Sequence, residues 1–386
     1  MKIYFKDSII TQLDVEKSID EIFNNFNLQP LGDVFIKPNF SGRFPIIKSE
    51  NTSIEILDAV VKKLESIQGV KRVLIGHYSL LSVDKSSFDF DTMINLGGYK
   101  DLLKYSKVSF ANLDLEAGIE IDIMGFKCYY PKILDNVDFF INMPKIKTHM
   151  ETGVSLSIKN LMGLVDDRSR KLFHKTNLNE MLGYLGIYFK PNINIMDGLI
   201  AMEGNGPHEG ENKIINSIIS GIDMVELDSF ISSLMGINFT NVLHIKKAME
   251  LGVGNYASNE ILSQYKDKIW SDYKKPDLFM RFGKKIFFWP TTSCSLCHEV
   301  MRLLKKKLKS NLLLGLKFYY YAYFSKKRIN IILGRCEFME YFVNDKNICI
   351  GICTRNYAEK NNLNCLIGCP PQIENVINFI FKELKV

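Results

Sequence analysis

The densest group of residues that could do chemistry lies between Pro144 and His174. It contains His149, Lys159 and His174, with the lysine ten residues after the first histidine and fifteen before the second. Histidine titrates near neutral pH and can move protons. A lysine in an apolar stretch can lose its charge when desolvated and then act as a nucleophile or a covalent anchor. The alternative interpretation is that Lys159 ends a helix and both histidines lie on the surface.

A second group follows a predicted strand and runs from Asp197 to Gly210. Its glycines favour a turn, and a glycine-rich loop after a strand can bind phosphate through backbone N–H groups. The spacing Gly204-x-Gly206-x-x-x-Gly210 is not a dinucleotide fingerprint, and Pro207 removes one N–H donor. Three side chains of this stretch are candidates for acid–base catalysis or ligand binding, namely Glu203, Asn205 and His208. The competing interpretation is a tight loop that needs glycine for its shape alone.

Lysines stand close to the predicted strand ends. Lys37 and Asn39 follow the apolar run 33–37, and Lys145 and Lys147 precede His149. Ligands of parallel sheets bind where strands end, and clustered lysines favour an anionic small molecule. We therefore expect a cleft with two sets of residues. The catalytic set is His149, Lys159, His174 and Glu203, and the substrate-binding set is Lys37, Asn39, Lys145, Lys147, Asn205 and His208.

Seven of the eight cysteines lie in the last quarter of the chain, and six of them form three closely spaced pairs. Cys294-Ser-Leu-Cys297 is a CxxC pair, and two further pairs are spaced by four, Cys349 with Cys353 and Cys365 with Cys369. A CxxC turn presents two thiolates to one metal, and distant loops can supply two more. We predict a [4Fe–4S] cluster on Cys294, Cys297, Cys353 and Cys369. Structural zinc, a redox dithiol and plain buried thiols are the alternatives, and Cys349 or Cys365 could replace a chosen ligand.

These groups need a scaffold of strands alternating with helices. Strand-like runs at 33–37, 72–76, 137–142 and 192–197 are separated by helical stretches such as 54–67, which is typical of βαβ units. The stretch 119–130 alternates around Gly125 and predicts a hairpin. We therefore expect an α/β fold with a mainly parallel sheet and flanking helices in residues 1–270, and a smaller cysteine-bearing α/β region in 271–386.

The segment from Lys274 to Arg328 is strongly basic. It holds fourteen Lys and Arg against two acids, although the whole chain is only at +6. The part 301–328 joins lysines to leucines and tyrosines, which suits a packed helix with a solvated lysine face or peripheral contact with an anionic membrane. Nucleic acid ranks last as a partner because no recognition motif is present. With no apolar signal-peptide core at the N-terminus, we expect a cytoplasmic location, with membrane association as the alternative.

Several motifs in order resemble domain-of-unknown-function family 362. They are Lys37-Pro-Asn39, 144–163, 197–210, 223–236 and Gly368-Cys-Pro-Pro371. The family is associated with iron–sulfur chemistry, and many relatives carry a ferredoxin-type CxxCxxC insert, which this chain lacks. The order His149, Lys159, His174 is also similar to that in nickel-pincer lactate racemases. That resemblance implies a tethering role for Lys159 and ligand or proton-transfer roles for the histidines, on a shared scaffold without the same cofactor.

Together these features suggest an iron–sulfur or metal-binding protein that acts as a redox or isomerase-type enzyme on an anionic small molecule, with a redox partner. The alternative is an accessory protein that transfers electrons or binds a structural metal, located at a membrane surface. Whether the chain is an enzyme at all stays open, as do the substrate, the reaction, iron versus zinc and the oligomeric state.

Overall fold

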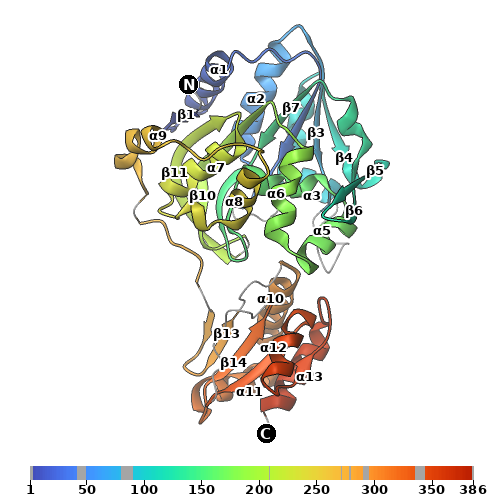
Figure 1. Cartoon of the computed structure of the whole chain (residues 1–386), viewed down its shortest axis with the longest axis vertical. Helices are drawn as coiled ribbons and strands as arrows, with labels where there is room; N and C mark the ends of the chain where they lie inside the picture. The colour runs from blue at the N-terminus through green and yellow to red at the C-terminus, as the bar shows by residue number, and fades with distance from the viewer. Residues whose placement is uncertain are drawn as a thin grey trace. The chain divides into compact units, whose positions relative to one another are not determined.

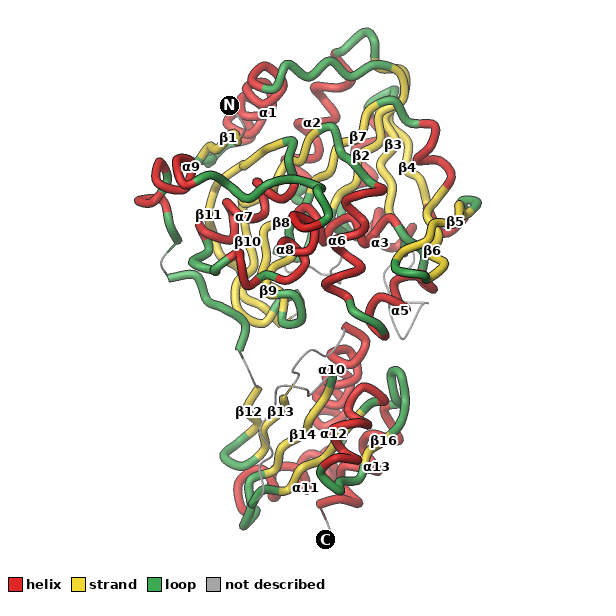
Figure 2. Tube along the Cα trace, viewed as in Figure 1, coloured by secondary structure: helices red, strands yellow, loops and turns green. Residues whose placement is uncertain are grey.

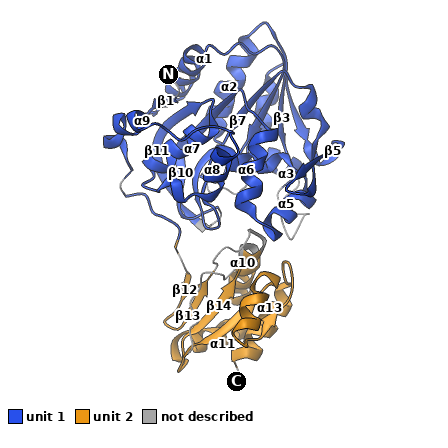
Figure 3. Ribbon diagram, in the orientation of Figure 1, with its two compact units in different colours: residues 1–276 blue, residues 277–386 orange. Residues whose placement is uncertain are grey.

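The computed structural model describes residues 3–40, 49–79, 90–207, 209–270, 272–277, 280–289, 295–334 and 344–384. The chain divides into two compact units, Met1–Pro276 and Asp277–Val386 (Figure 3). Each unit has its own sheet and its own helices, so each is described separately.

Among its described residues, unit 1 has one large sheet with the strand order β1-β11-β10-β7-β2-β3-β4, and β8 and β9 attach to β10. The centre of the sheet is parallel, from β10 through β7, β2 and β3 to β4. β1, β9 and β11 pair antiparallel at its margins. The mainly parallel sheet predicted from the sequence is confirmed. The strands are β1 (Ile3–Lys6), β2 (Gly32–Pro38), β3 (Val70–His77), β4 (Val108–Asn112), β7 (Phe139–Met143), β8 (Lys145–His149), β9 (Gly153–Ser155), β10 (Ile193–Asn205) and β11 (Glu209–Gly221).

Helices cover both faces of this sheet because its strands are apolar on both sides. Val34 and Ile36 of β2 join a core with α1 and α2, while Phe35 between them joins the core on the other face, with residues of α6 and α7. Figure 1 shows α6, α7 and α8 together on one side of the sheet. The helices are α1 (Gln12–Asn25), α2 (Ile54–Ser66), α3 (Phe90–Leu96), α4 (Ser157–Asn160), α5 (Asp167–Lys175), α6 (Leu178–Tyr188), α7 (Met224–Leu234), α8 (Leu243–Glu250) and α9 (Asn259–Gln264).

Local signals explain several of these bounds. The side chain of Thr11 and the carboxylate of Asp14 form a capping box at the start of α1. Asp223 caps α7 by accepting from the N–H groups of Val225 and Glu226, as its place before an apolar helix predicts. The predicted hairpin is confirmed as β5 (Gly118–Ile123) and β6 (Phe126–Pro131), which turn at Gly125.

Two polar stretches that the sequence favoured as loops are strands. Residues 145–149 form β8, which pairs parallel with β10 and antiparallel with β9, and all five of its residues are buried. Residues 197–205 continue β10, and Glu209 begins β11, so the glycine-rich stretch is a long hairpin and not a phosphate-binding loop. Figure 2 shows β10 and β11 as two long neighbouring strands.

Unit 2 contains a second sheet with the order β12-β13-β14-β15-β16 in its described residues. β13 to β16 are parallel, and β12 pairs antiparallel with β13. No helix in the described residues is both long and apolar enough to cross a bilayer. The elements are β12 (Met280–Phe282), β13 (Ile286–Trp289), β14 (Ile329–Leu333), β15 (Lys346–Ile350), β16 (Cys365–Leu366), α10 (Ser295–Ser310), α11 (Leu312–Phe324), α12 (Arg355–Lys360) and α13 (Ile373–Leu384).

Candidate functional site

A row of polar side chains crosses the carboxyl ends of β2 and β7 and the start of β10. Lys37 on β2 stands beside Asn142 on β7, and Asn142 stands beside Asn194 on β10. The amide of Asn142 donates to Asn194 Oδ1 at 2.8 Å and to the carbonyl of Ser157 at 3.1 Å. Asn160 Nδ2 donates to Asn142 Oδ1 at 2.8 Å. All three asparagines are buried, so their hydrogen bonds hold the short helix α4 against the end of the sheet.

Asp228 on α7 holds the other end of α4. Its carboxylate accepts from the N–H of Ser157 at 2.9 Å and from the N–H of Ile158 at 3.0 Å. Burial raises the pKa of Asp228 to about 7, although these donors oppose the shift. Because Lys159 is the next residue of this capped turn, Asp228 positions it indirectly. Asp228 lies within the sequence motif 223–236, to which the sequence assigned no catalytic or binding role.

The predicted group of His149, Lys159 and His174 comes together around Glu151. Nδ1 of His174 lies 3.3 Å from Glu151 Oε2, and the N–H of Glu151 donates to His149 Nδ1 at 3.1 Å. The pKa of Lys159 falls to about 8, because desolvation outweighs the negative charge of Glu151. Because His149 Nδ1 accepts the N–H of Glu151, the neutral ring of His149 carries its proton on Nε2.

His244 on α8 is a further member of this group. Burial first, and the charge of Lys159 second, lower the pKa of His244 to about 3. Neither ring nitrogen of His244 has a hydrogen-bond partner within the part of the chain that the structure describes. Sequence reasoning missed both His244 and Glu151. The order of motifs gives no signal for His244, which lies 70 residues beyond His174.

Lys37 and His77 meet at Gly163. Lys37 is fully buried, and its Nζ donates to the carbonyl of Pro38 at 2.7 Å. A Cβ on Gly163 would lie 2.8 Å from Lys37 Nζ and 3.0 Å from His77 Nε2, so only glycine allows this approach. Burial, together with the charges of Arg170 and Lys147, holds the pKa of Lys37 well below its usual value.

His77 is neutral in this setting. Burial and the charge of Lys37 hold its pKa well below the usual value. Its Nδ1 forms a short hydrogen bond with the carbonyl of Tyr78, and a carbonyl only accepts, so Nδ1 carries the proton. Nε2, which faces the same glycine as Lys37, is then an unprotonated base. Sequence reasoning assigned no role to His77, the last residue of β3.

Arg170 on α5 is a nearly buried cation of the same region. Its Nη2 donates to Asp167 Oδ1 at 2.5 Å and to the carbonyl of Ser79 at 2.9 Å. Its Nε has no hydrogen-bond partner in the described residues. The guanidinium stacks near Tyr78, 5.5 Å from the ring centroid.

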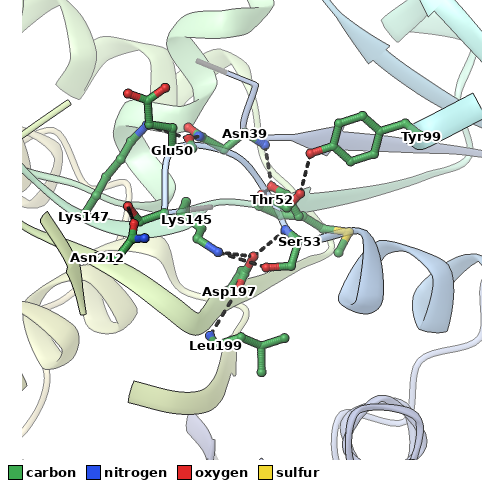
Figure 4. Close-up of polar contacts among 12 residues, drawn as sticks. Asn39, Glu50, Thr52, Ser53, Tyr99, Lys145, Lys147, Asp197, Leu199 and Asn212 are labelled. Atoms are coloured by element: carbon green, nitrogen blue, oxygen red, sulfur yellow. Dashed lines mark hydrogen bonds and ion pairs between the residues drawn. The ribbon is translucent and has the colours of Figure 1, made fainter. Parts of the chain in front are cut away.

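Lys145 and Lys147 on β8 differ in how they are compensated (Figure 4). Lys145 Nζ lies 2.7 Å from Asp197 Oδ2 and 3.0 Å from Ser53 Oγ, and both members of the ion pair are fully buried. Lys147 Nζ donates to the carbonyl of Glu50 at 3.3 Å. Desolvation lowers the pKa of Lys147 to about 7 against the charge of Glu50. The Lys145–Asp197 pair is therefore a closed structural unit, whereas the pKa of Lys147 lies near neutral pH.

Asn39 lies beside Lys147. Its Nδ2 donates to the same carbonyl of Glu50 at 2.6 Å, and its backbone N–H donates to Thr52 Oγ1 at 2.8 Å. Figure 4 places Asn39, Glu50 and Lys147 side by side. The structure thus places Lys37 and Asn39 at the carboxyl end of β2, and Lys145 and Lys147 on β8.

The predicted residues of 203–208 have other surroundings. Glu203 accepts from the N–H of Lys274 at 3.0 Å, and its carboxylate lies 3.6 Å from Lys213 Nζ and 3.7 Å from Lys274 Nζ. These contacts make Glu203 part of an ion network on the β10–β11 hairpin. Asn205 ends β10, and His208 lies outside the described residues.

A cavity of about 700 Å³ opens elsewhere in unit 1, between the β5–β6 hairpin and α5. It is lined by basic side chains, among them Lys127, Arg168 and Lys171. None of the buried lysines described above lines it, so we treat it as separate from the candidate site.

Three loops of unit 2 meet around a buried thiol. Cys297, in the first turn of α10, is buried. A Cβ on Gly351 would lie 3.8 Å from Cys297 Sγ and 3.8 Å from the carbonyl of Gly368. The N–H of Ile352 donates to that carbonyl at 3.0 Å. The chain segments that lead to Cys353 and Cys369 are thus joined next to Cys297, with φ of +96° at Gly351.

The remaining cysteines of the tail have other settings. Cys349 is fully buried within β15, and Cys365 Sγ lies 3.2 Å from Thr354 Oγ1. Cys294, a predicted ligand, lies outside the described residues. Among those that the structure describes, no three His, Cys, Asp or Glu side chains group closely enough to hold a metal ion.

Comparison with known proteins gives three similarities. Residues 34–233 match the family described as domain of unknown function (DUF362). Thylakoid-associated protein sll1697 of Synechocystis sp. is 26% identical over 153 residues, and the match covers 38% of this chain and about half, 48%, of that protein. The lactate racemase apoprotein from Thermoanaerobacterium thermosaccharolyticum is 14% identical with a TM-score of 0.40, covering 86% of this chain and 69% of that one.

The family match reaches from the start of β2 to the end of α7. It therefore includes the asparagine row, Lys37, Lys145 and Lys147. It also includes the group around Glu151 apart from His244. Since this match covers more than half of the sequence, the chain belongs to the DUF362 family.

Proposed function

We propose that unit 1 binds a small-molecule anion among Lys37, Lys147 and Arg170 and moves protons on it. The observation that carries this proposal is Lys37. Its ammonium group is fully buried, its closest described hydrogen bond is to a neutral carbonyl, and its nearest influential charges are positive. A buried charge without a counter-charge is unfavourable by several kcal/mol. An anionic ligand would supply that counter-charge.

The pKa values of Lys147 and Lys159 support the same proposal. The pKa of Lys147 is about 7 and that of Lys159 about 8, so both titrate near neutral pH. An anion beside them would stabilise their charged forms and raise both pKa values. Ligand binding should therefore take up protons, and affinity should fall as pH rises from about 6 to 9.

Proton transfer would fall to the groups whose pKa values and tautomers suit it. His77 offers an unprotonated Nε2, and Lys159, with its pKa near 8, can act as acid or base near neutral pH. His149 and His174 flank Glu151, which can fix their orientation. We keep Glu203 outside this set, because Lys213 and Lys274 already engage its carboxylate. The reaction class that this arrangement suits best is an isomerase-type proton transfer.

We also propose a [4Fe–4S] cluster on Cys294, Cys297, Cys353 and Cys369, with zinc as the alternative. The meeting of the three loops at Gly351 supports this ligand set. A bound cluster would supply single electrons to a redox partner, and thiol ligands of this kind suit the reducing cytoplasm. This centre favours a second candidate function, an accessory protein that transfers electrons or holds a structural metal.

A ligand screen separates the two candidates. Thermal unfolding is followed with carboxylates, dicarboxylates and phosphomonoesters at about pH 6, for the wild type and for Lys37→Met. A ligand at a hundred times its Kd should add about 2.7 kcal/mol to the free energy of unfolding. Lys71→Met, which removes an exposed lysine from β3, is the matched control.

The anion-binding function predicts at least one ligand whose effect is lost in Lys37→Met and kept in Lys71→Met. No stabilising anion in any class, with iron or zinc bound in stoichiometric amount, would favour the accessory protein instead. An anion that stabilises both variants equally would place binding elsewhere and remove the proposed site.

A further inference from the structure

Helix α11 has a packed face that fixes its orientation. The ring of Phe318 is buried against Phe282 of β12 and Phe288 of β13, with centroids 4.9 and 6.4 Å away. The carbonyl of Ala322 accepts from the N–H groups of Lys284 and Lys285 at 2.8 Å. The side of the helix opposite Phe318 and Ala322 is therefore the outward side.

That outward side is apolar except at one edge, where Lys317 is exposed. Seven of its side chains are exposed, from 36% for Tyr323 to 77% for Leu312. At 100° per residue they lie within an arc of about 140°. A contiguous apolar surface of this kind marks a site of interaction. The seven residues, here called the α11 apolar face, are Leu312, Leu313, Leu316, Tyr319, Tyr320, Tyr323 and Phe324.

Exposed lysines stand at both ends of this face. Lys305, Lys306 and Lys309 lie in the last turns of α10, just before α11, and Lys326 and Lys327 follow its end. The sequence has no Asp or Glu between residues 300 and 336. The segment thus combines an apolar helix face with a net positive charge.

We propose that the α11 apolar face lies in the surface of an anionic lipid bilayer, with these lysines against the headgroups. Charge complementarity selects this occupant. A second copy of the chain, docked face to face, would bring two sets of lysines together without a single acid from these segments. A helix of 13 residues, about 20 Å long, cannot span a bilayer, but it can lie in the interface. Tyrosines suit that depth, since the ring is apolar and the hydroxyl is wet.

This inference is independent of the anion site in unit 1, so the two can be tested apart. The full chain is sedimented with vesicles of phosphatidylcholine alone and with vesicles that contain about 30 mol% phosphatidylglycerol. The wild type should bind the anionic vesicles at least about 10-fold more tightly than the neutral ones, and binding should weaken as salt screens the lysines. The variant Leu313→Gln/Leu316→Gln/Tyr320→Gln should lose at least about 10-fold in affinity.

A second variant changes charge and leaves the apolar face intact. Lysines near an anionic surface contribute about fivefold each, so Lys306→Gln/Lys309→Gln should weaken binding by about 30-fold. The matched control, Ile10→Gln/Ile214→Gln, removes two exposed apolar side chains from unit 1 and should leave vesicle binding unchanged.

Three results would overturn the proposal. They are a wild type that binds neither kind of vesicle, equal binding to neutral and anionic vesicles, and a wild-type dimer in light scattering that the triple glutamine variant turns into a monomer. The last result would assign the α11 apolar face to a second copy of the chain.

Discussion

Replacing Lys147 by Met should change how the stability of unit 1 depends on pH. Lys147 is 1% exposed, and burial lowers its pKa from 10.5 to about 7. Between these two values the unfolded chain holds a proton that the folded chain has released. Raising the pH through this window therefore stabilises the folded wild type, and below the window the full cost of burying the charge applies. A methionine of similar length has no such titration.

The expected magnitude follows from the two pKa values. From about pH 7 to about pH 9, Lys147 should add about 2 kcal/mol to the free energy of unfolding of the wild type. The variant lacks this gain. We therefore expect Lys147→Met to be more stable than the wild type at about pH 7, and its advantage to shrink by about 2 kcal/mol at about pH 9.

The assay is urea unfolding at several pH values in a Trp289→Phe background. That change leaves Trp270 of unit 1 as the single tryptophan, so fluorescence reports the unit that contains Lys147. Lys71→Met, on the exposed side of β3, should show no comparable pH-dependent difference. A difference between Lys147→Met and the wild type that stays constant over this range, or grows with pH, would refute the reasoning.

Three further outcomes are expected. Burial raises the pKa of Asp228 from 3.8 to about 7, so the folded carboxyl keeps a proton that the unfolded carboxyl loses, and the stability of the wild type falls as pH rises from about 4 to 7. In urea unfolding, Asp228→Asn should lack about 4 kcal/mol of this fall. A variant with the pH profile of the wild type would contradict the assignment. Asn142→Leu should lower the free energy of unfolding by about 3 kcal/mol, because it leaves buried partners on Asn194 and Ser157 unsatisfied; a neutral effect would show that the row does not hold α4. Cys297→Ser should lose iron or zinc in metal analysis after anaerobic purification, and Cys128→Ser of unit 1 should keep it; equal metal content in both would remove Cys297 from the ligand set.

The parallel core could be predicted because its strands are short apolar runs. Residues 33–37, 72–76, 137–142 and 192–197 lie within or largely overlap β2, β3, β7 and β10. These runs are bounded by turn residues and separated by helical spacing. The local pattern of apolar residues is enough to predict a strand where both faces of the sheet are buried.

The strand β8 could not be assigned from pattern alone, because its alternating lysines read as a polar loop. Their burial depends on partners far along the chain, such as Asp197 for Lys145 and Glu50 for Lys147. The sequence does not reveal which carboxylate meets which lysine.

The candidate site was predicted in part for the same reason. The motif 144–174 indicated His149, Lys159 and His174, which do meet around Glu151. His244 arrives from α8 through tertiary packing, and its nearest sequence neighbours carry no motif. His77 becomes a candidate base only when Tyr78 fixes its tautomer and Lys37 stands opposite.

The most direct test of the anion site is to locate a bound anion by its own scattering. Crystals grown at about pH 6, where Lys147 and Lys159 are charged, are soaked in bromide or selenate and measured at the absorption edge of the soaked element. We predict an anomalous peak among Lys37, Lys147 and Arg170 that disappears in Lys37→Met. Peaks on exposed lysines with none at Lys37 would contradict the central claim.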